Sequence, residues 1–130
     1  MTRKTCICEI ILMDSLKGLR VLEIYGLVPL QMTGQMLADQ GASVLVVRPM
    51  ADSGTDYLMR GKGEVRINLK KDYEVDFLLK RVIPNTDVLI ESFRPGVLDN
   101  LRFGPDQVHE VNKKVIYVRI SGYSQMESPY

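Results

Sequence analysis

The chain has 130 residues, of which 45% are hydrophobic and 25% are charged, and its formal net charge is +1. This is the balance of one globular domain that is large enough to bury a core, and it argues against a disordered chain. A net charge so close to zero gives no reason to expect nucleic acid as a partner. No apolar run approaches the roughly 18 residues that a membrane-spanning helix needs, so no membrane partner is expected.

Residues 1–15 are expected to form a poorly ordered leader, and residues 16–130 to form the domain. Glu9 interrupts the apolar stretch of the leader and no small-residue cleavage site follows it, so a secretory signal is not expected. An organelle-targeting extension is left open. The two cysteines, Cys6 and Cys8, are too few for a zinc site and too close for an unstrained disulfide. We therefore expect free thiols in a reducing compartment.

Hydrophobic periodicity along the rest of the chain predicts strands that alternate with helices. Strands are expected at 19–24, 43–47, 64–69, 87–90 and 115–120, and helices at 29–40, at 73–82 and from 105. Pro29 and Pro105 suit the first turn of a helix, which needs no amide donor there, and Gly41 suits a left-handed helix end. In the first helix Leu30 should face the core and Gln35 should point mostly away from it. The alternation predicts an α/β fold with a Rossmann-like, mainly parallel sheet and flanking helices.

The segment Glu91-Ser-Phe-Arg-Pro-Gly96 directly follows the fourth predicted strand. In a parallel sheet, ligands bind in the crevice beyond the carboxyl ends of the strands. Phe93 offers a face on which a purine can stack, Arg94 offers fixed donors for phosphate, and Pro95-Gly96 fixes the turn. The segment predicts a nucleotide-like ligand that carries phosphates, with an ordinary surface turn as the alternative.

The basic residues of the chain agree with a phosphate-bearing ligand, but no common nucleotide-binding motif is present. A basic run comprises Arg60, Lys62, Arg66, Lys70 and Lys71, which suits either a solvated sheet edge or a phosphate-binding face. The chain has no Gly-x-Gly-x-x-Gly after the first strand, no P-loop and no Gly-x-Ser-x-Gly elbow. The single histidine, His109, is expected to be a surface residue on a helical turn rather than a catalytic group.

Several segments together resemble the N-terminal part of the family III CoA-transferases and their relatives, the α-methylacyl-CoA racemases. They occur in the family's order at 16–23, 37–42, 47–49, 60–62, 67–70, 87–91, 93–97, 115–123 and 125. Arg48-Pro49 and the run Tyr117-Val-Arg-Ile-Ser-Gly-Tyr123 are more similar to the racemases. The sequence departs from the family where Lys62-Gly-Glu64 replaces Lys-Arg-Ser, and where Asn68 replaces a common aspartate.

The resemblance implies a ligand and its binding residues. The ligand is a coenzyme A (CoA) thioester, which is a substrate rather than a prosthetic group, and no metal is implied. The implied CoA-binding residues are Arg48, Ile67, Asn68, Leu69, Lys70, Phe93 and Arg94. The resemblance also implies that the catalytic histidine of a Gly-His-Asp motif and later aspartates lie beyond Tyr130. No residue of this chain is therefore predicted to be catalytic, and whether the chain is an enzyme is left open.

Three functions remain as hypotheses. The first is a truncated α-methylacyl-CoA racemase-like protein, whose intact relative would epimerise a 2-methylacyl-CoA by α-proton transfer. The second is a fragment of a family III CoA-transferase, which moves CoA between carboxylic acids through a nucleophilic aspartate. The third is a non-enzymatic remnant or CoA-binding module with exposed apolar faces. The resemblance implies a homodimer for the intact protein and an intracellular location, with mitochondrion, peroxisome and cytoplasm left open.

Overall fold

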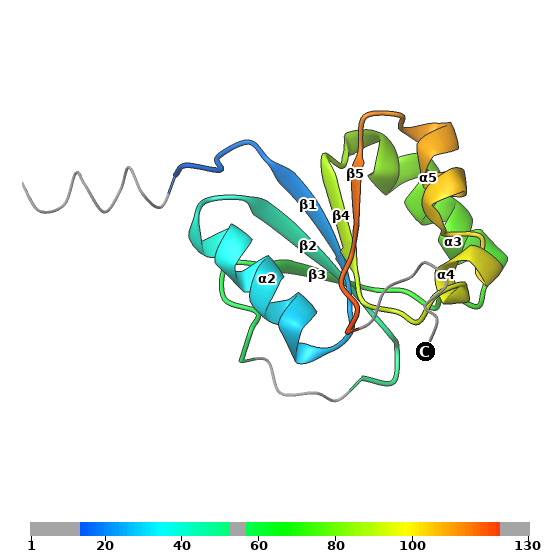
Figure 1. The fold of residues 1–130 in the computed structure, drawn as a ribbon, viewed down its shortest axis with the longest axis horizontal. Coiled ribbons are helices and arrows are strands. Elements are labelled where there is room, and N and C mark those ends of the chain that lie inside the picture. The colour runs from blue at the N-terminus through cyan, green and yellow to red at the C-terminus, as the bar shows by residue number, and fades with distance from the viewer. Residues whose placement is uncertain (1–13, 53–56, 123–130) are drawn as a thin grey trace, which may run out of the picture.

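A five-stranded, entirely parallel sheet forms the centre of the molecule (Figure 1). The computed structural model describes residues 14–52 and 57–122. Residues 1–13 of the predicted leader, which include Cys6 and Cys8, therefore lie outside the described residues. The strand order is β3-β2-β1-β4-β5. The strands are β1 (Arg20–Ile24), β2 (Ser43–Arg48), β3 (Gly63–Arg66), β4 (Val88–Glu91) and β5 (Ile116–Arg119).

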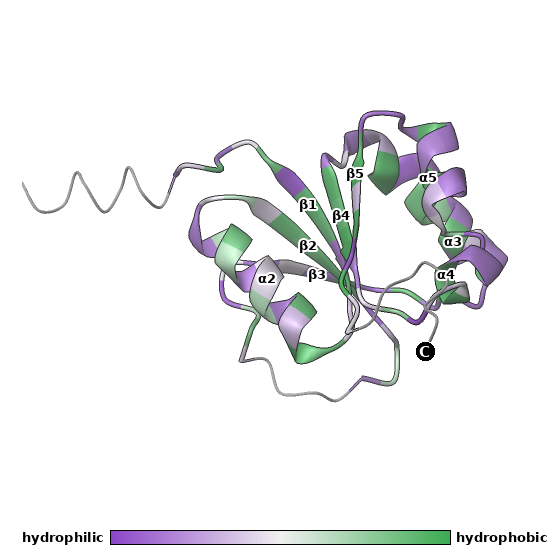
Figure 2. Ribbon diagram, viewed as in Figure 1, coloured by the Kyte–Doolittle hydropathy of each residue, from purple (hydrophilic) through white to green (hydrophobic). Residues whose placement is uncertain are grey.

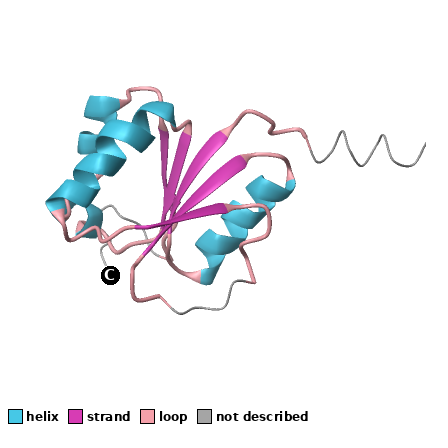
Figure 3. Cartoon of the chain, turned by 180° about the vertical axis from the view of Figure 1, so that it is seen from behind, coloured by secondary structure: helices cyan, strands magenta, loops and turns pink. Residues whose placement is uncertain are grey.

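Helices cover both faces of the sheet (Figures 1 and 3). One face is covered by α2 (Val28–Asp39), and the other is covered by the group that contains α3, α4 and α5. The helices of this group are α3 (Asp72–Phe77), the π-helical η1 (Leu78–Val82), the 3₁₀-helical η2 (Ile83–Asn85), α4 (Val97–Asn100) and α5 (Pro105–Val111). The predicted α/β fold with a parallel sheet is thus confirmed. In the described part of the chain no helix is both long and apolar enough to cross a bilayer.

The central strands β1, β2 and β4 are largely hydrophobic because both of their faces are buried, whereas the edge strand β3 is mostly exposed. Successive residues of a strand point to opposite faces, so Val21 packs beneath α2 while Leu22 packs against the other helices. Figure 2 shows the central strands β1, β2 and β4 as hydrophobic over most of their length. Glu23 is the buried charged residue of β1 and lies on the α2 face, whereas Arg20 at the start of the strand is exposed.

Two glycines that the chain needs in the left-handed region lie where the sequence predicts turns. Gly41 has a φ of 95° just after α2, which confirms the predicted helix end. Gly96 has a φ of 81°, and the N–H of Val97 donates to the carbonyl of Arg94 at 3.1 Å. Pro95 followed by a glycine with positive φ is the pattern of a type II turn. The turn predicted after the fourth strand is therefore present.

Three predictions about single residues or boundaries were wrong. The third strand ends at Arg66 rather than near Leu69, because Asn68 bonds to groups outside the sheet. Gln35 is buried rather than pointing away from the core. Its side-chain amide donates, at 2.8 Å, to the carbonyl of Arg60, which is distant in the sequence. His109 is half-buried rather than a surface residue, and its Nε2 lies 3.1 Å from the Val115 carbonyl.

Asn112 joins the end of α5 to the segment before β4. Its side-chain amide donates to the carbonyls of Ile83 and Thr86, both at 2.9 Å, and its Oδ1 accepts from the Lys114 amide. We expect Asn112→Ala to lower the free energy of unfolding by about 1–3 kcal/mol, because two carbonyls lose their donor. Urea-induced unfolding followed by circular dichroism measures this.

Asn85→Ala is the matched control for that prediction. Asn85 is exposed, and its side chain makes one long contact of 3.5 Å with the Arg81 carbonyl. Its replacement should change stability by less than about 0.5 kcal/mol. If both variants lose the same free energy of unfolding, the hydrogen bonds of the Asn112 side chain do not stabilise the fold.

Candidate functional site

A pocket of about 490 Å³ opens at the carboxyl ends of the parallel strands. The strand order places β1 between β2 and β4, so the connections leave in opposite directions on either side of it, which is where ligands bind in open α/β sheets. The pocket is lined by Ile24, Tyr25, Val47, Arg48, Pro49, Met50, Ala51, Ile67, Asn68, Leu69, Lys70, Phe93 and Leu101. Six of the seven residues predicted to bind CoA are among them.

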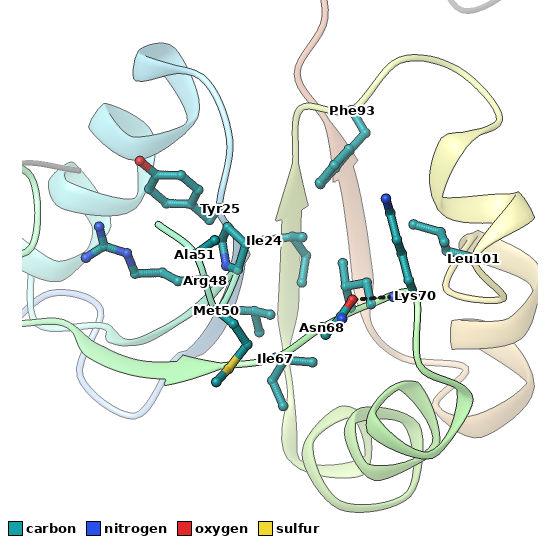
Figure 4. Close-up of a pocket in the computed structure, with 13 residues that line it drawn as sticks. Ile24, Tyr25, Arg48, Met50, Ala51, Ile67, Asn68, Lys70, Phe93 and Leu101 are labelled. Carbon is teal, nitrogen blue, oxygen red and sulfur yellow. Dashed lines mark hydrogen bonds between the residues drawn. The ribbon is translucent and has the colours of Figure 1, made fainter. Parts of the chain in front are cut away.

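Figure 4 shows that the pocket has two ends. Tyr25 and Arg48 lie at one end, and Phe93, Lys70 and Leu101 lie at the other. The side chain of Lys70 extends toward Phe93. The sequence predicts that Phe93 and Arg94 of one turn supply the aromatic ring and the cation. In this pocket the cation on the Phe93 side is instead Lys70, which comes from the loop after another strand.

Within the described residues, two carboxylates hold Arg48 in the wall of the pocket. Its side chain is 2% exposed, and its Nη2 and Nε lie 2.6 and 2.9 Å from Oδ2 of Asp52. Its Nη1 lies 3.1 Å from Oε2 of Glu64. The guanidinium also lies over the ring of Tyr25, 5.0 Å from its centroid. The positive charge of Arg48 is thus compensated within the protein.

The segment that follows β3 is shaped by hydrogen bonds that replace the sheet ladder. The Ile67 amide still donates to the Arg48 carbonyl at 2.9 Å, and this bond is the last one in strand register. The Asn68 amide instead donates to Oε2 of Glu74 at 2.6 Å, and this bond lowers the pKa of Glu74. The Lys70 amide donates to Oδ1 of Asn68 at 3.0 Å. Residues 67–70 therefore leave the sheet and line the pocket instead of continuing β3.

Lys70 differs from Arg48 in its surroundings. Its side chain is exposed, and no acceptor for its ammonium is found in the part of the chain that the structure describes. At the Phe93 end of the pocket, the positive charge of Lys70 is therefore not neutralised by the described residues. At the other end, the positive charge of Arg48 is neutralised by carboxylates.

Glu91 positions Phe93, and sequence reasoning missed this role. The Glu91 side chain is 3% exposed at the end of β4, where its Oε2 accepts from the Phe93 amide at 2.6 Å and its Oε1 lies 3.1 Å from Nε of Arg119. Burial raises the pKa of Glu91, and the bond from Phe93 and the charge of Arg119 oppose that rise. A carboxylate at the end of an otherwise apolar strand, two residues before an aromatic, was the available signal.

Arg94 does not line this pocket. It lies with Leu27, Ser92 and Gly122 in a neighbouring hollow of about 450 Å³, to which Phe93 also contributes. Ser92 joins the two sides of that hollow, since its hydroxyl accepts from the Leu27 amide at 3.2 Å. A Cβ on Gly26 would collide with the same hydroxyl, so a larger residue there would require the Ser92 side chain to move. Arg94 is thus the one predicted CoA-binding residue that does not line the first pocket, and Phe93 contributes to both hollows.

The described residues offer binding groups rather than a reaction centre. No group of three His, Cys, Asp or Glu side chains within residues 14–52 and 57–122 is placed to hold a metal ion. The basic run is divided: Lys62 is buried against Glu23, whereas Arg60 and Lys70 are exposed. Apolar walls with an aromatic ring and one uncompensated cation suit a bound nucleotide.

Comparison with known proteins decides the family. The family model of CoA-transferase family III matches residues 16–130, which are most of the chain. The chain belongs to this family. The sequence is 41% identical to α-methylacyl-CoA racemase from Mus musculus over 110 residues, which are 85% of this chain and 29% of that protein. It is 34% identical to succinyl-CoA–D-citramalate CoA-transferase from Chloroflexus aurantiacus over an alignment that covers 88% of this chain and 32% of that protein.

A solved structure of a probable fatty acyl-CoA transferase has the same fold. The crystal structure of Rv3272 from Mycobacterium tuberculosis superposes with a TM-score of 0.79 at 28% identity, covering 88% of this chain and 35% of that one. The chain therefore spans about a third of the length of the relatives it matches. Both racemases and transferases are among these relatives, so family membership alone does not choose between the two reactions.

Proposed function

We propose that the pocket binds the nucleotide part of a CoA thioester, and that the protein is an α-methylacyl-CoA racemase-like member of family III. The observation that carries the proposal is the gathering of Arg48, residues 67–70 and Phe93 around one pocket at the carboxyl edge of the sheet. Phe93 would stack on the adenine or lie beside its ribose, and Lys70 and Arg48 would contact phosphates.

Identity to the relatives favours the racemase over the transferase. The mouse racemase is 41% identical to this chain, against 34% for the citramalate CoA-transferase. In a racemase the thioester acidifies the α-proton of the acyl group, and acid–base groups remove and return it through an enolate. We assign no described residue to that step, and the contribution of this chain is to bind and orient the CoA part of the substrate.

The transferase is the second candidate, because the family as a whole is named for CoA transfer. The transcript sequence that follows the codon for Tyr130 distinguishes the two. A Gly-His-Asp motif there is expected for the racemase. Its absence, with an aspartate further along, would favour the transferase. A stop codon at that point would instead support a CoA-binding module without catalysis.

Binding of CoA should depend on Lys70 and Phe93. Charge-assisted hydrogen bonds to phosphate contribute about 1.5–3 kcal/mol, and exposure brings Lys70 toward the lower value. We expect Lys70→Ala to weaken CoA binding about tenfold, since about 1.4 kcal/mol corresponds to one decade of Kd. Phe93→Ala should weaken it by a similar factor of roughly ten through lost stacking. Isothermal titration calorimetry of CoA into the full chain measures both.

Lys80→Ala is the matched control for Lys70→Ala. Lys80 is an exposed cation on η1, does not line the pocket, and pairs with Asp76 at 3.6 Å. Its replacement should leave the Kd for CoA unchanged. Added salt should weaken binding to the parent more than to Lys70→Ala, because an exposed ion pair with phosphate is screened. If both pocket variants bind CoA as the parent does, the assignment of this pocket is wrong.

A homodimer is part of the same proposal. Val28, Met32 and Met36 are spaced four residues apart along α2, so they share one helix face, and their exposed fractions are 51–60%. An apolar face of this kind favours association with another surface. Sedimentation of the protein at micromolar concentration tests it, with a dimer expected and a single monomeric species counting against it.

A further inference from the structure

We infer that Glu64 is an internal counter-ion that competes with the phosphates of the ligand for Arg48, and so sets the anion preference of the pocket. The inference rests on the proposed function in naming CoA as the ligand. Its physical basis is independent of the acyl group and of the reaction, because it concerns only which anion the guanidinium of Arg48 faces.

The register of the sheet explains why a carboxylate is needed at this position. Arg48 of β2 and Arg66 of β3 lie directly opposite one another in the parallel ladder. Like charges opposite one another on neighbouring strands destabilise a sheet. Glu64 lies between them: its Oε2 is 3.1 Å from Nη1 of Arg48, and its Oε1 is 3.5 Å from Nε of Arg66. One carboxylate therefore bridges two arginines.

The two carboxylates on Arg48 differ in how easily they could give way. The Asp52 side chain is 13% exposed and makes the two shorter contacts with Arg48. The Glu64 side chain is 38% exposed, and its contact with Arg48, at 3.1 Å, is longer than those of Asp52. Water can solvate Glu64 if it leaves, whereas Asp52 would lose more contacts. Glu64 is thus the carboxylate that an incoming phosphate would displace.

The consequence is a cost on phosphate binding that removal of one charge should lift. With Glu64 in place, Arg48, Arg66, Asp52 and Glu64 sum to zero charge. In E64Q the same group carries one positive charge, and the amide oxygen can still accept a hydrogen bond from a guanidinium. An anion near Arg48 then gains attraction without first displacing a carboxylate.

The test is titration of three probes into the full chain, E64Q and the control E110Q. The probes are CoA, inorganic pyrophosphate and pantetheine, which lacks phosphate. Glu110 is exposed on α5 and does not line the pocket, so E110Q makes the same change in charge elsewhere. E64Q should bind CoA and pyrophosphate about three- to tenfold more tightly than the parent, with a gain that shrinks as salt rises. Pantetheine binding, and all binding to E110Q, should match the parent.

The outcomes separate this inference from the proposed function. If the parent and E64Q bind CoA with equal affinity, the inference about Glu64 is overturned, but the proposed CoA site is still supported. Tighter pyrophosphate binding by E64Q, with no CoA binding by any variant, supports the counter-ion and overturns the CoA site. Absence of binding by every probe overturns both.

A second uncharged variant guards against a folding defect. Glu64→Ser is titrated in place of E64Q if E64Q melts below the assay temperature, and Glu64→Asp retains the charge. If both uncharged variants unfold while Glu64→Asp stays folded, the inference is overturned, because Glu64 then serves the fold alone.

Discussion

Replacing Lys62 by methionine is expected to lower the free energy of unfolding by about 3–5 kcal/mol at neutral pH, because it leaves a buried carboxylate without its counter-ion. The ammonium of Lys62 lies 2.7 Å from Oε2 of Glu23 and 3.0 Å from the carbonyl of Gln31. The two side chains are 0% and 1% exposed. Helix α2 passes so closely that a Cβ on Gly34 would collide with the Glu23 carboxylate.

The loss should depend on pH in a direction that identifies its cause. Burial raises the pKa of Glu23, and the hydrogen bond and charge of Lys62 oppose that rise. Without Lys62 the pKa in the folded state should rise further above that of the unfolded chain. Between the two pKa values the folded state holds a proton that the unfolded state releases, so stability falls as pH rises. Urea unfolding should therefore show a smaller loss at pH 5 than at pH 8.

Two variants control this prediction. Lys80→Met makes the same substitution in an exposed pair with Asp76, and should cost no more than about 0.5 kcal/mol. The double variant Glu23→Leu, Lys62→Met removes both buried charges and should recover most of the lost stability, since apolar replacements of buried pairs are often neutral. A double variant no more stable than Lys62→Met would contradict our account.

Phe103→Ala is expected to destabilise the fold by about 3–5 kcal/mol, because it opens a cavity between the sheet and the helices that cover its second face. Phe103 is 0% exposed and belongs to the larger of the two core clusters. Its carbonyl accepts from the Tyr117 hydroxyl at 3.2 Å, and burial raises the pKa of that phenol, which keeps it protonated as a donor.

The neighbouring backbone explains how the ring is held in place. Arg102, just before Phe103, has a φ of 60°, a backbone conformation that residues other than glycine seldom adopt. Its guanidinium lies 3.1 Å from both Asp72 and Asp76 on α3. The turn after α4 is thereby fixed to α3, and Phe103 points into the core.

Phe77→Ala is the matched control for Phe103→Ala. Phe77 is 49% exposed on α3, so the same truncation should cost less than about 1 kcal/mol. Phe103→Leu should fall between the two, because it retains most of the buried volume. Chemical unfolding measures all three. Similar losses for Phe77→Ala and Phe103→Ala would show that burial at position 103 is not the cause.

Local pattern was sufficient to predict the elements whose signals lie within a few residues. The apolar runs of β1, β2 and β4 are buried on both faces, so continuous hydrophobicity identified them. Pro29 and Gly41 mark the ends of a helix through their own backbone preferences, and Pro95-Gly96 does the same for the turn after β4. From the alternation of strands and helices the parallel sheet followed, and with it the edge at which a ligand would bind.

Only the tertiary structure decided how the charged residues are used. Lys62 and Arg66 belong to one basic run in the sequence, yet Lys62 is buried against Glu23, 39 residues away, while Arg66 stays partly exposed. Arg48 and Arg94 occupy similar places after strands, yet Arg48 is enclosed by Asp52 and Glu64 and Arg94 lies in another hollow. The strength of an ion pair depends on burial and on partners brought together by strand order. A sequence shows neither, so it determined the sheet and the edge at which the candidate pocket opens, and the fold determined which cations line that pocket.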